Sequence, residues 1–140
     1  MRAPLTYEAA RAAADAVLTA GRAEGLHLAV AVVDRGGITR ILLADDGAGP
    51  IAIETARRKA YTSAVTGFTT TVFAQFAASP QMAAVPQHTI DANLLPAPGG
   101  LPITVDDSEV IGGIGVGGAD GETDDRIAAT ALKSIADLLA

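Results

Sequence analysis

The apolar residues of this chain follow two patterns, short continuous runs and helical spacing. Residues 28–33 and 38–43 are mostly Val, Ile, Leu and Ala and are too short for helices, so each predicts a strand. Elsewhere apolar residues recur three and four positions apart, and Thr6 and Gly25 are suitable residues to begin and end the first helix. The predicted elements are a helix between Thr6 and Gly25, strands at 28–33 and 38–43, helices at 51–66 and 70–78, strands at 101–105 and 109–116, and a helix at 123–139.

The order of these elements, α-β-β-α-α-β-β-α, predicts an α+β fold in a single domain spanning residues 1–140. The short turns 34–37 (Asp-Arg-Gly-Gly) and 106–108 (Asp-Asp-Ser) join consecutive strands and so predict two hairpins. Two hairpins with flanking helices indicate a mainly antiparallel sheet covered by helices. Residues 80–100 are interrupted by prolines and predict a long loop, which in a compact domain usually has a function or covers something.

The last predicted strand is unusually rich in glycine, with Gly113, Gly115 and Gly118 forming a G-x-G-x-x-G pattern. A dinucleotide-binding pattern of this kind opens a βαβ unit and needs an acidic residue about 20 residues later, after a second strand. The sequence leaves room for one helix only, so this interpretation fails. Glycine within a strand often marks close approach to its backbone. We therefore expect a helix, a neighbouring subunit or a flat ligand to lie against this strand.

Composition excludes several classes of function. The net charge of −6 argues against a nucleic-acid partner, which needs clustered Lys and Arg. The sequence has no cysteine, so it forms neither a disulfide nor a thiolate metal site. It shows no signal-peptide pattern and no apolar segment of about 18 residues, so we expect no membrane partner and a cytoplasmic location.

Several motifs resemble the GlcG/HbpS-like family, the haem-degrading or haem-binding domain that also forms the C-terminal part of PduO-type proteins. The matching blocks, in order, are residues 31–37 (AVVDRGG), 46–48 (DGA), 58–64 (RKAYTSA), 98–103 (PGGLPI), 112–118 (GGIGVGG) and Asp124 with Ala128. The resemblance covers nearly the whole chain, and the last two stretches, 98–103 and 112–118, are the specific ones. It implies a profilin-like fold, homo-oligomers, and an association with haem or a corrinoid.

The resemblance also selects candidate ligand-binding residues. Lys59 and Thr62 lie three apart on one predicted helix and share a face. Lys59 can bind an anionic ligand group, and the backbone at Gly99 and Gly100 can add N–H donors. Asp124 completes this predicted site. The alternative interpretations are a solvated basic patch at residues 57–59 and a favourable interaction of Asp124 with its helix dipole.

Haem ligation also requires a donor such as imidazole. His88 lies in the long loop near Asp91, which can orient it, and it joins the predicted ligand-binding residues; a plain polar loop residue is the alternative. His27 is expected to be a histidine at the solvent edge of a strand.

Two main functions remain open at this point, besides a purely structural or assembly role. The first is a homo-oligomeric protein that binds a small molecule, namely haem, a related tetrapyrrole or a corrinoid. The second is a small-molecule enzyme, an isomerase or lyase of a catabolic or biosynthetic pathway, with its pocket at the subunit interface. Its polar groups would come from Lys59, Thr62, Asp124 and His88.

Overall fold

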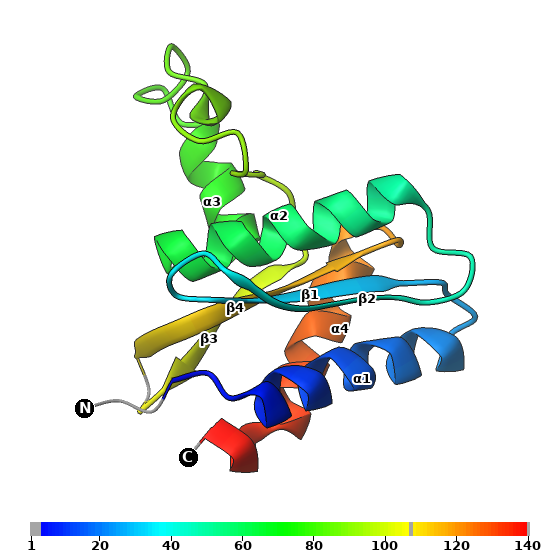
Figure 1. Cartoon of the computed structure of the whole chain (residues 1–140). Helices are drawn as coiled ribbons and strands as arrows, with labels where there is room; N and C mark the ends of the chain where they lie inside the picture. The colour runs from blue at the N-terminus through cyan, green and yellow to red at the C-terminus, as the bar shows by residue number, and fades with distance from the viewer. Residues whose placement is uncertain (1–3, 107, 140) are drawn as a thin grey trace.

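The computed structural model describes residues 4–106 and 108–139, so Asp107 of the predicted turn and residues 1–3 and 140 of the predicted domain lie outside the described residues. Figure 1 shows the helices and strands along the chain. They are α1 (Tyr7–Ala23), β1 (Ala29–Asp34), β2 (Thr39–Ala44), α2 (Pro50–Thr66), α3 (Thr70–Ala77), the 3₁₀ helix η1 (Gln87–Thr89), β3 (Gly100–Val105), β4 (Glu109–Gly117), α4 (Gly121–Ser134) and the 3₁₀ helix η2 (Ala136–Leu139).

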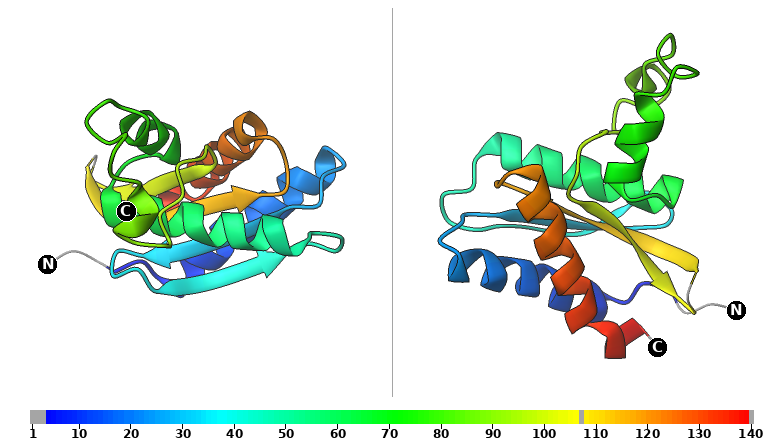
Figure 2. Two further views of the ribbon diagram at one scale, coloured as in Figure 1. Left: turned by 90° about the horizontal axis from the view of Figure 1, so that it is seen from above. Right: turned by 180° about the vertical axis from the view of Figure 1, so that it is seen from behind.

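The four strands form one antiparallel sheet in the order β2-β1-β4-β3. Each hairpin contributes two neighbouring strands, and the hairpins meet where β1 pairs with β4, with Ala31 opposite Gly115. Figure 2 shows α2 on one face of the sheet and α1 with α4 on the other. The predicted order of elements and the α+β fold class are confirmed.

The helix ends follow local hydrogen bonding. The hydroxyl of Thr6 accepts a hydrogen bond from the Ala9 amide at the start of α1, and Asp120 does the same for Thr123 at the start of α4. The predicted end of α4 is wrong. Apolar spacing continues to residue 139, but the α-helix ends at Ser134 and the chain continues as the 3₁₀ helix η2. Spacing alone does not distinguish one more helical turn from such a tightened end.

The glycine-rich strand β4 lies directly against the backbone of α2. A Cβ atom added to Gly115 would overlap the carbonyl oxygen of Ala56 and lie 2.5 Å from the amide nitrogen of Ala60. Gly113 and Gly117 are related to the Ala60 and Ala52 carbonyl oxygens in the same way. Among the three expected neighbours, the helix is therefore confirmed.

The opposite face of the sheet holds the main apolar core. Val30, Val32, Ile114 and Val116 point from the central strands toward α1 and α4, and all are buried. The helices contribute small residues together with a few larger ones: Ala9, Ala10, Ala13, Ala14, Val17, Ile127, Ala128 and Ala131. Aliphatic side chains, not close backbones, fill the space on this side.

A segment that we call the arm, residues 70–90, projects away from the sheet (Figures 1 and 2). It comprises α3 and the loop that follows, including η1. The inner side of α3 is buried at Thr70 and Phe73, while its outer side leaves Val72 and Phe76 exposed. Among the described helices, none is long and apolar enough to cross a membrane.

Candidate functional site

Lys59 and Asp124 form a buried ion pair where α2 meets the first turn of α4. The Nζ of Lys59 donates to Asp124 Oδ2 at 3.0 Å and to the carbonyl oxygen of Val116 at 2.9 Å. The other carboxylate oxygen of Asp124 accepts from the Ala119 amide at 3.1 Å. Lys59 is 5% exposed and Asp124 is 1% exposed. The pair therefore joins α2, the end of β4 and α4 in the interior of the domain.

The turn before β3 closes over this ion pair. Gly99 has a φ of +122°, and a Cβ there would lie 2.9 Å from Lys59 Nζ, so both conformation and space favour glycine. Its carbonyl accepts from the Val116 amide at 2.9 Å. The amide of Gly100 donates to the hydroxyl of Thr70 at 2.8 Å. The structure thus brings together Lys59, Gly99, Gly100 and Asp124, as the sequence motifs implied.

The environment of Lys59 bears on two expectations, the solvated basic patch at residues 57–59 and the role of Asp124. A solvated basic patch is wrong for Lys59, because its ammonium group is buried and paired. Arg57 and Arg58 do remain partly exposed beside Glu54. Burial raises the pKa of Asp124 above its ordinary value, and the nearby Lys59 ammonium opposes that rise. Asp124 therefore points inward as a partner of Lys59, in addition to lying near the positive end of its helix.

Thr62 lies beneath a segment that we call the strap, residues 91–95, which returns from the arm across the outer side of α2. The hydroxyl of Thr62 accepts from the Leu95 amide at 2.9 Å and donates to the Arg58 carbonyl at 2.8 Å. Two further contacts fix the strap: the Tyr61 hydroxyl donates to Asp91, and Arg57 donates to the Asn93 side chain at 3.0 Å. These bonds cover the outward face of α2.

The strap contacts are site features that the sequence reasoning missed. Arg57 and Tyr61 are four residues apart and so share a helix face, which was the available signal. Their partners, Asp91 and Asn93, lie in a loop without any periodic pattern, so nothing in the sequence paired them. The hydrogen bond from Tyr61 lowers the pKa of Asp91, and Asp91 raises the pKa of Tyr61.

The two histidines lie in different parts of the fold. His88 is exposed in η1 on the arm, and the structure does not bring it to Lys59. His27 is exposed two residues before β1, as expected, and lines a cavity of about 230 Å³ with Arg22, Asp45 and Asp46. Within residues 4–106 and 108–139, no group of three or more His, Asp or Glu side chains is placed to hold a metal ion.

Comparison with known proteins gives the family. The family model described as haem degrading protein, HbpS-like, matches residues 5–133. The chain belongs to the HbpS-like family. Its sequence is 36% identical to a double mutant of HbpS from Streptomyces reticuli; the match covers 96% of this chain and 88% of that one, with a TM-score of 0.84.

Other solved structures share the HbpS-like fold of this chain. The protein ORFY from Klebsiella pneumoniae is 25% identical over 97% of this chain and 94% of its own, with a TM-score of 0.87. The protein in the PduOC:Heme complex is 22% identical over 94% of this chain and 95% of its own, with a TM-score of 0.85, which shows the fold alone. No match is found among curated proteins.

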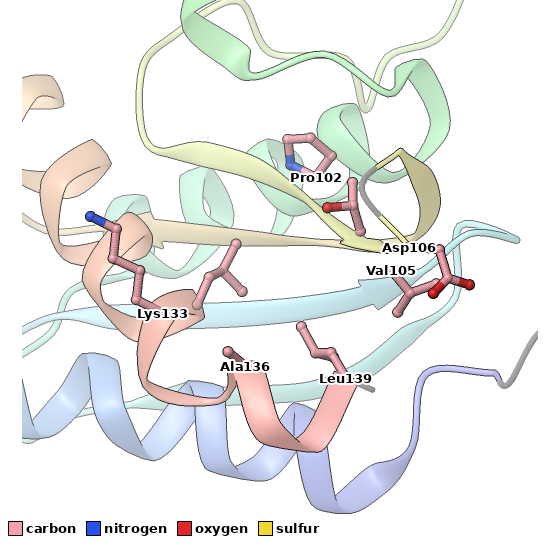
Figure 3. Close-up of a pocket in the computed structure, with 8 residues that line it drawn as sticks. Pro102, Val105, Asp106, Lys133, Ala136 and Leu139 are labelled. Atoms are coloured by element: carbon pink, nitrogen blue, oxygen red, sulfur yellow. The ribbon is translucent and has the colours of Figure 1, made fainter.

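In this HbpS-like chain, the described cavities do not coincide with the buried ion pair. One, of about 370 Å³, lies between β3 and the end of α4 (Figure 3). A second is the cavity beside His27. The polar groups around Lys59 are bonded to one another and to the backbone, so this cluster holds three parts of the fold together in the conformation described here.

Proposed function

We propose that this protein is a homo-oligomer that binds haem, a related tetrapyrrole or a corrinoid. Membership of the HbpS-like family supports a haem-related ligand. The observation that carries the proposal is the composition of the arm. It bears an exposed imidazole, His88, on the same projecting segment as the exposed apolar residues Phe76, Val85 and Ile90. The cytoplasmic location expected from the sequence stays a prediction.

The arm has two kinds of group that suit a haem, an imidazole and exposed apolar side chains. Haem is a flat and largely apolar ring whose iron would bind a donor such as imidazole. His88 would provide that donor, and the apolar side chains of the arm would contact the ring. The arm is thus chemically suited to haem, whereas the Lys59 cluster lacks an imidazole or thioether and is already internally bonded.

Lys59, Thr62, Gly99, Gly100 and Asp124 remain proposed ligand contacts, with one condition added by their bonding. The strap covers Thr62, and the 98–100 turn covers the ion pair, so a ligand reaches these groups only when those segments leave α2. In the structure described here, Thr62 holds the strap that returns from the arm, and Gly99 and Gly100 form the turn over the ion pair.

Oligomer formation would complete such a site. Val72 and Phe76 lie four residues apart on α3 and form an exposed apolar stripe there, and Phe68, just before the helix, is also exposed. Exposed apolar groups arranged in this way are typical of interaction surfaces. A second copy of the chain covering the stripe would bury both it and one side of a bound ring. Light scattering at micromolar protein concentration should therefore give at least a dimer mass; a monomer mass contradicts this part of the proposal.

The decisive experiment is a haemin titration followed by visible spectroscopy. The wild-type protein should show a sharp, stoichiometric change in the Soret band, and His88→Ala should abolish it. His27→Ala is the matched control, because His27 is the other histidine of the sequence and is also exposed. Broad, nonspecific absorbance with the wild type contradicts haem binding. If His27→Ala loses the Soret change and His88→Ala keeps it, the haem does not bind at the arm.

The enzyme alternative has one supporting observation, the raised pKa of Asp124 beside Lys59. Buried titratable pairs of this kind are enriched at catalytic sites, although structural ion pairs share the property. A screen against isomerase and lyase substrates would test it with Asp124→Asn. Turnover that is lost in this variant while its haemin titration and fold are unchanged favours the enzyme.

A further inference from the structure

A cleft at the far end of α4 from Asp124 has the features of a second binding site. Its volume is about 370 Å³, which lies at the lower end of the range for small-molecule sites, about 300–1,000 Å³. It is formed by β3, by the last turn of α4 and by η2. Figure 3 shows Lys133 on one side of the cleft and Asp106 on the other.

About half of the lining of the cleft is apolar. Val105 from β3, Leu132 from α4 and Leu139 from η2 line it, and each is only partly buried. Ala136 adds a small exposed residue between the last two. Three elements therefore converge on a recess whose aliphatic surface is still open to a ligand.

Lys133 supplies the available positive charge of this cleft. Among residues 4–106 and 108–139 it is the Lys or Arg side chain with neither an ion pair nor a hydrogen bond. Asp106 already has an interaction of its own. The cleft therefore offers one available cation, which attracts an anion as a compact point charge.

The surrounding charges favour a ligand with a single negative charge. The carboxylate of Asp106 lies on the side away from Lys133, and the C-terminal end of α4 carries the negative end of the helix dipole. Both disfavour a second negative charge on the ligand. We propose that the cleft binds a monocarboxylate with a short unbranched apolar chain, its carboxylate on Lys133 and its chain on Val105, Leu132 and Leu139.

Fatty acids of increasing length are suitable probes. Butanoate, hexanoate and octanoate would be titrated while the methyl resonances of Val105, Leu132 and Leu139 are followed by NMR. Each added methylene should strengthen binding by up to about fourfold until the cleft is filled. Octan-1-ol and octylamine test the requirement for negative charge and should bind more weakly than octanoate.

Variants separate the role of the charge from general effects. Lys133→Gln should weaken octanoate binding about fivefold, the upper range for an exposed ion pair, and Lys133→Arg should retain it. Arg11→Gln is the matched control, because it removes the same charge from the exposed face of α1. Ala136→Phe should fill the cleft and abolish binding. All four variants should keep the wild-type melting temperature, since the changes are at exposed positions.

Lysine chemistry gives an independent readout. The sequence contains two lysines, and Lys59 is buried, so acylation followed by mass spectrometry reports Lys133 against an internal reference. Octanoate should protect Lys133 and leave the low reactivity of Lys59 unchanged. The proposal is overturned if octanoate fails to bind, if octan-1-ol or octylamine binds as tightly, or if Lys133→Gln binds octanoate like the wild type.

Discussion

The two faces of the sheet are packed in different ways. On the α1 and α4 side, residues such as Ile114 and Val116 fill the space with aliphatic side chains. On the α2 side, Gly113, Gly115 and Gly117 of the same strand have no side chains, and the backbone of α2 takes their place. Alternate residues of β4 thus serve opposite faces, as the period of two along a strand requires.

This difference determines what each face tolerates. An aliphatic core loses stability gradually when a methylene is removed, because neighbouring side chains relax in part. A backbone-to-backbone contact has no side chain that can move aside, so an added atom must displace a whole helix. The α2 face should therefore respond sharply to any increase in size, and the α1–α4 face should respond smoothly to changes in either direction.

The largest expected effect comes from Gly115→Val. Its side chain would overlap the backbone of α2 at Ala56 and Ala60. We therefore expect the free energy of unfolding to fall by more than about 3 kcal/mol, or the variant to fail to fold. Ile114→Val, the neighbouring residue on the other face, should cost about 0.5–1.5 kcal/mol. Urea unfolding followed by circular dichroism measures both.

Gly49→Ala is a further control for that comparison. A Cβ there meets no atom within 4 Å, and its φ of −88° suits any residue, so the change should cost less than about 1 kcal/mol. If Gly115→Val unfolds at the same urea concentration as Ile114→Val, the two faces do not differ in the way described.

The second effect concerns the edge of the α2 face, where Lys59→Met leaves Asp124 buried without its cation. We expect the free energy of unfolding to fall by about 3–5 kcal/mol at pH 8, since removing one partner of a buried ion pair leaves an uncompensated charge. Replacing both residues, Lys59→Met with Asp124→Leu, should recover much of this loss. Urea unfolding of the two variants at pH 5 and pH 8 provides the measurement.

The pH dependence of Lys59→Met follows from the raised pKa of Asp124. Without Lys59 to oppose it, burial raises that pKa further above its unfolded value of about 3.9. The folded protein then holds the proton to higher pH than the unfolded chain. The contribution of Asp124 to the stability of this variant is therefore fully present below the unfolded pKa and is lost as pH rises through the folded-state pKa. A deficit that is equal at pH 5 and pH 8 contradicts a buried, unpaired Asp124.

The smallest effect is expected on the outer side of α2, at the strap. Tyr61→Phe removes the donor to Asp91 and should cost less than about 1 kcal/mol, because the contact is partly exposed. Amide hydrogen exchange at Leu95 should become faster, since the strap is held less firmly. Tyr7→Phe, the same change on α1, should leave the exchange of Leu95 unaltered.

The Tyr61 contact should also depend on pH, with the opposite sign to Asp124. The hydrogen bond lowers the pKa of Asp91, so its contribution is present above the unfolded value of about 3.9 and is lost as pH falls through the folded-state pKa. The difference between wild type and Tyr61→Phe should therefore shrink as pH falls below that unfolded value and disappear once Asp91 is protonated in the folded protein. A difference that persists there indicates packing of the ring and not its hydroxyl.

Local patterns were sufficient for most of the fold. Helix caps such as Thr6, the apolar runs of the strands and the short turns act over a few residues, so the sequence alone predicted the order of elements and the antiparallel sheet. The close approach to β4 was also predictable, because repeated glycine weakens a strand unless a neighbouring group needs the space. The sequence did not predict which group lies against β4, since the row of alanines on α2 also suits contact with a neighbouring subunit.

The candidate site was less accessible to sequence reasoning because its contacts are long-range. The resemblance to a family grouped Lys59, Gly99, Gly100 and Asp124, and the structure brings these residues together. The burial of Lys59 depends on an acid far along the chain, so a run of Arg-Arg-Lys looked solvated. The separation of His88 from this cluster arises from the projection of α3, which no local pattern indicates.

The glycine and alanine contact also constrains how this sequence can evolve. Four residues of α2 advance about 6.0 Å and two residues of β4 about 6.6 Å, so the successive contacts at Ala52, Ala56 and Ala60 stay nearly in step with alternate glycines. A one-residue insertion in the middle of α2 would turn the rest of the helix by about 100° and replace alanine with larger neighbours. Insertions should therefore accumulate in the arm, whereas α2 and β4 should keep a fixed length and change only together.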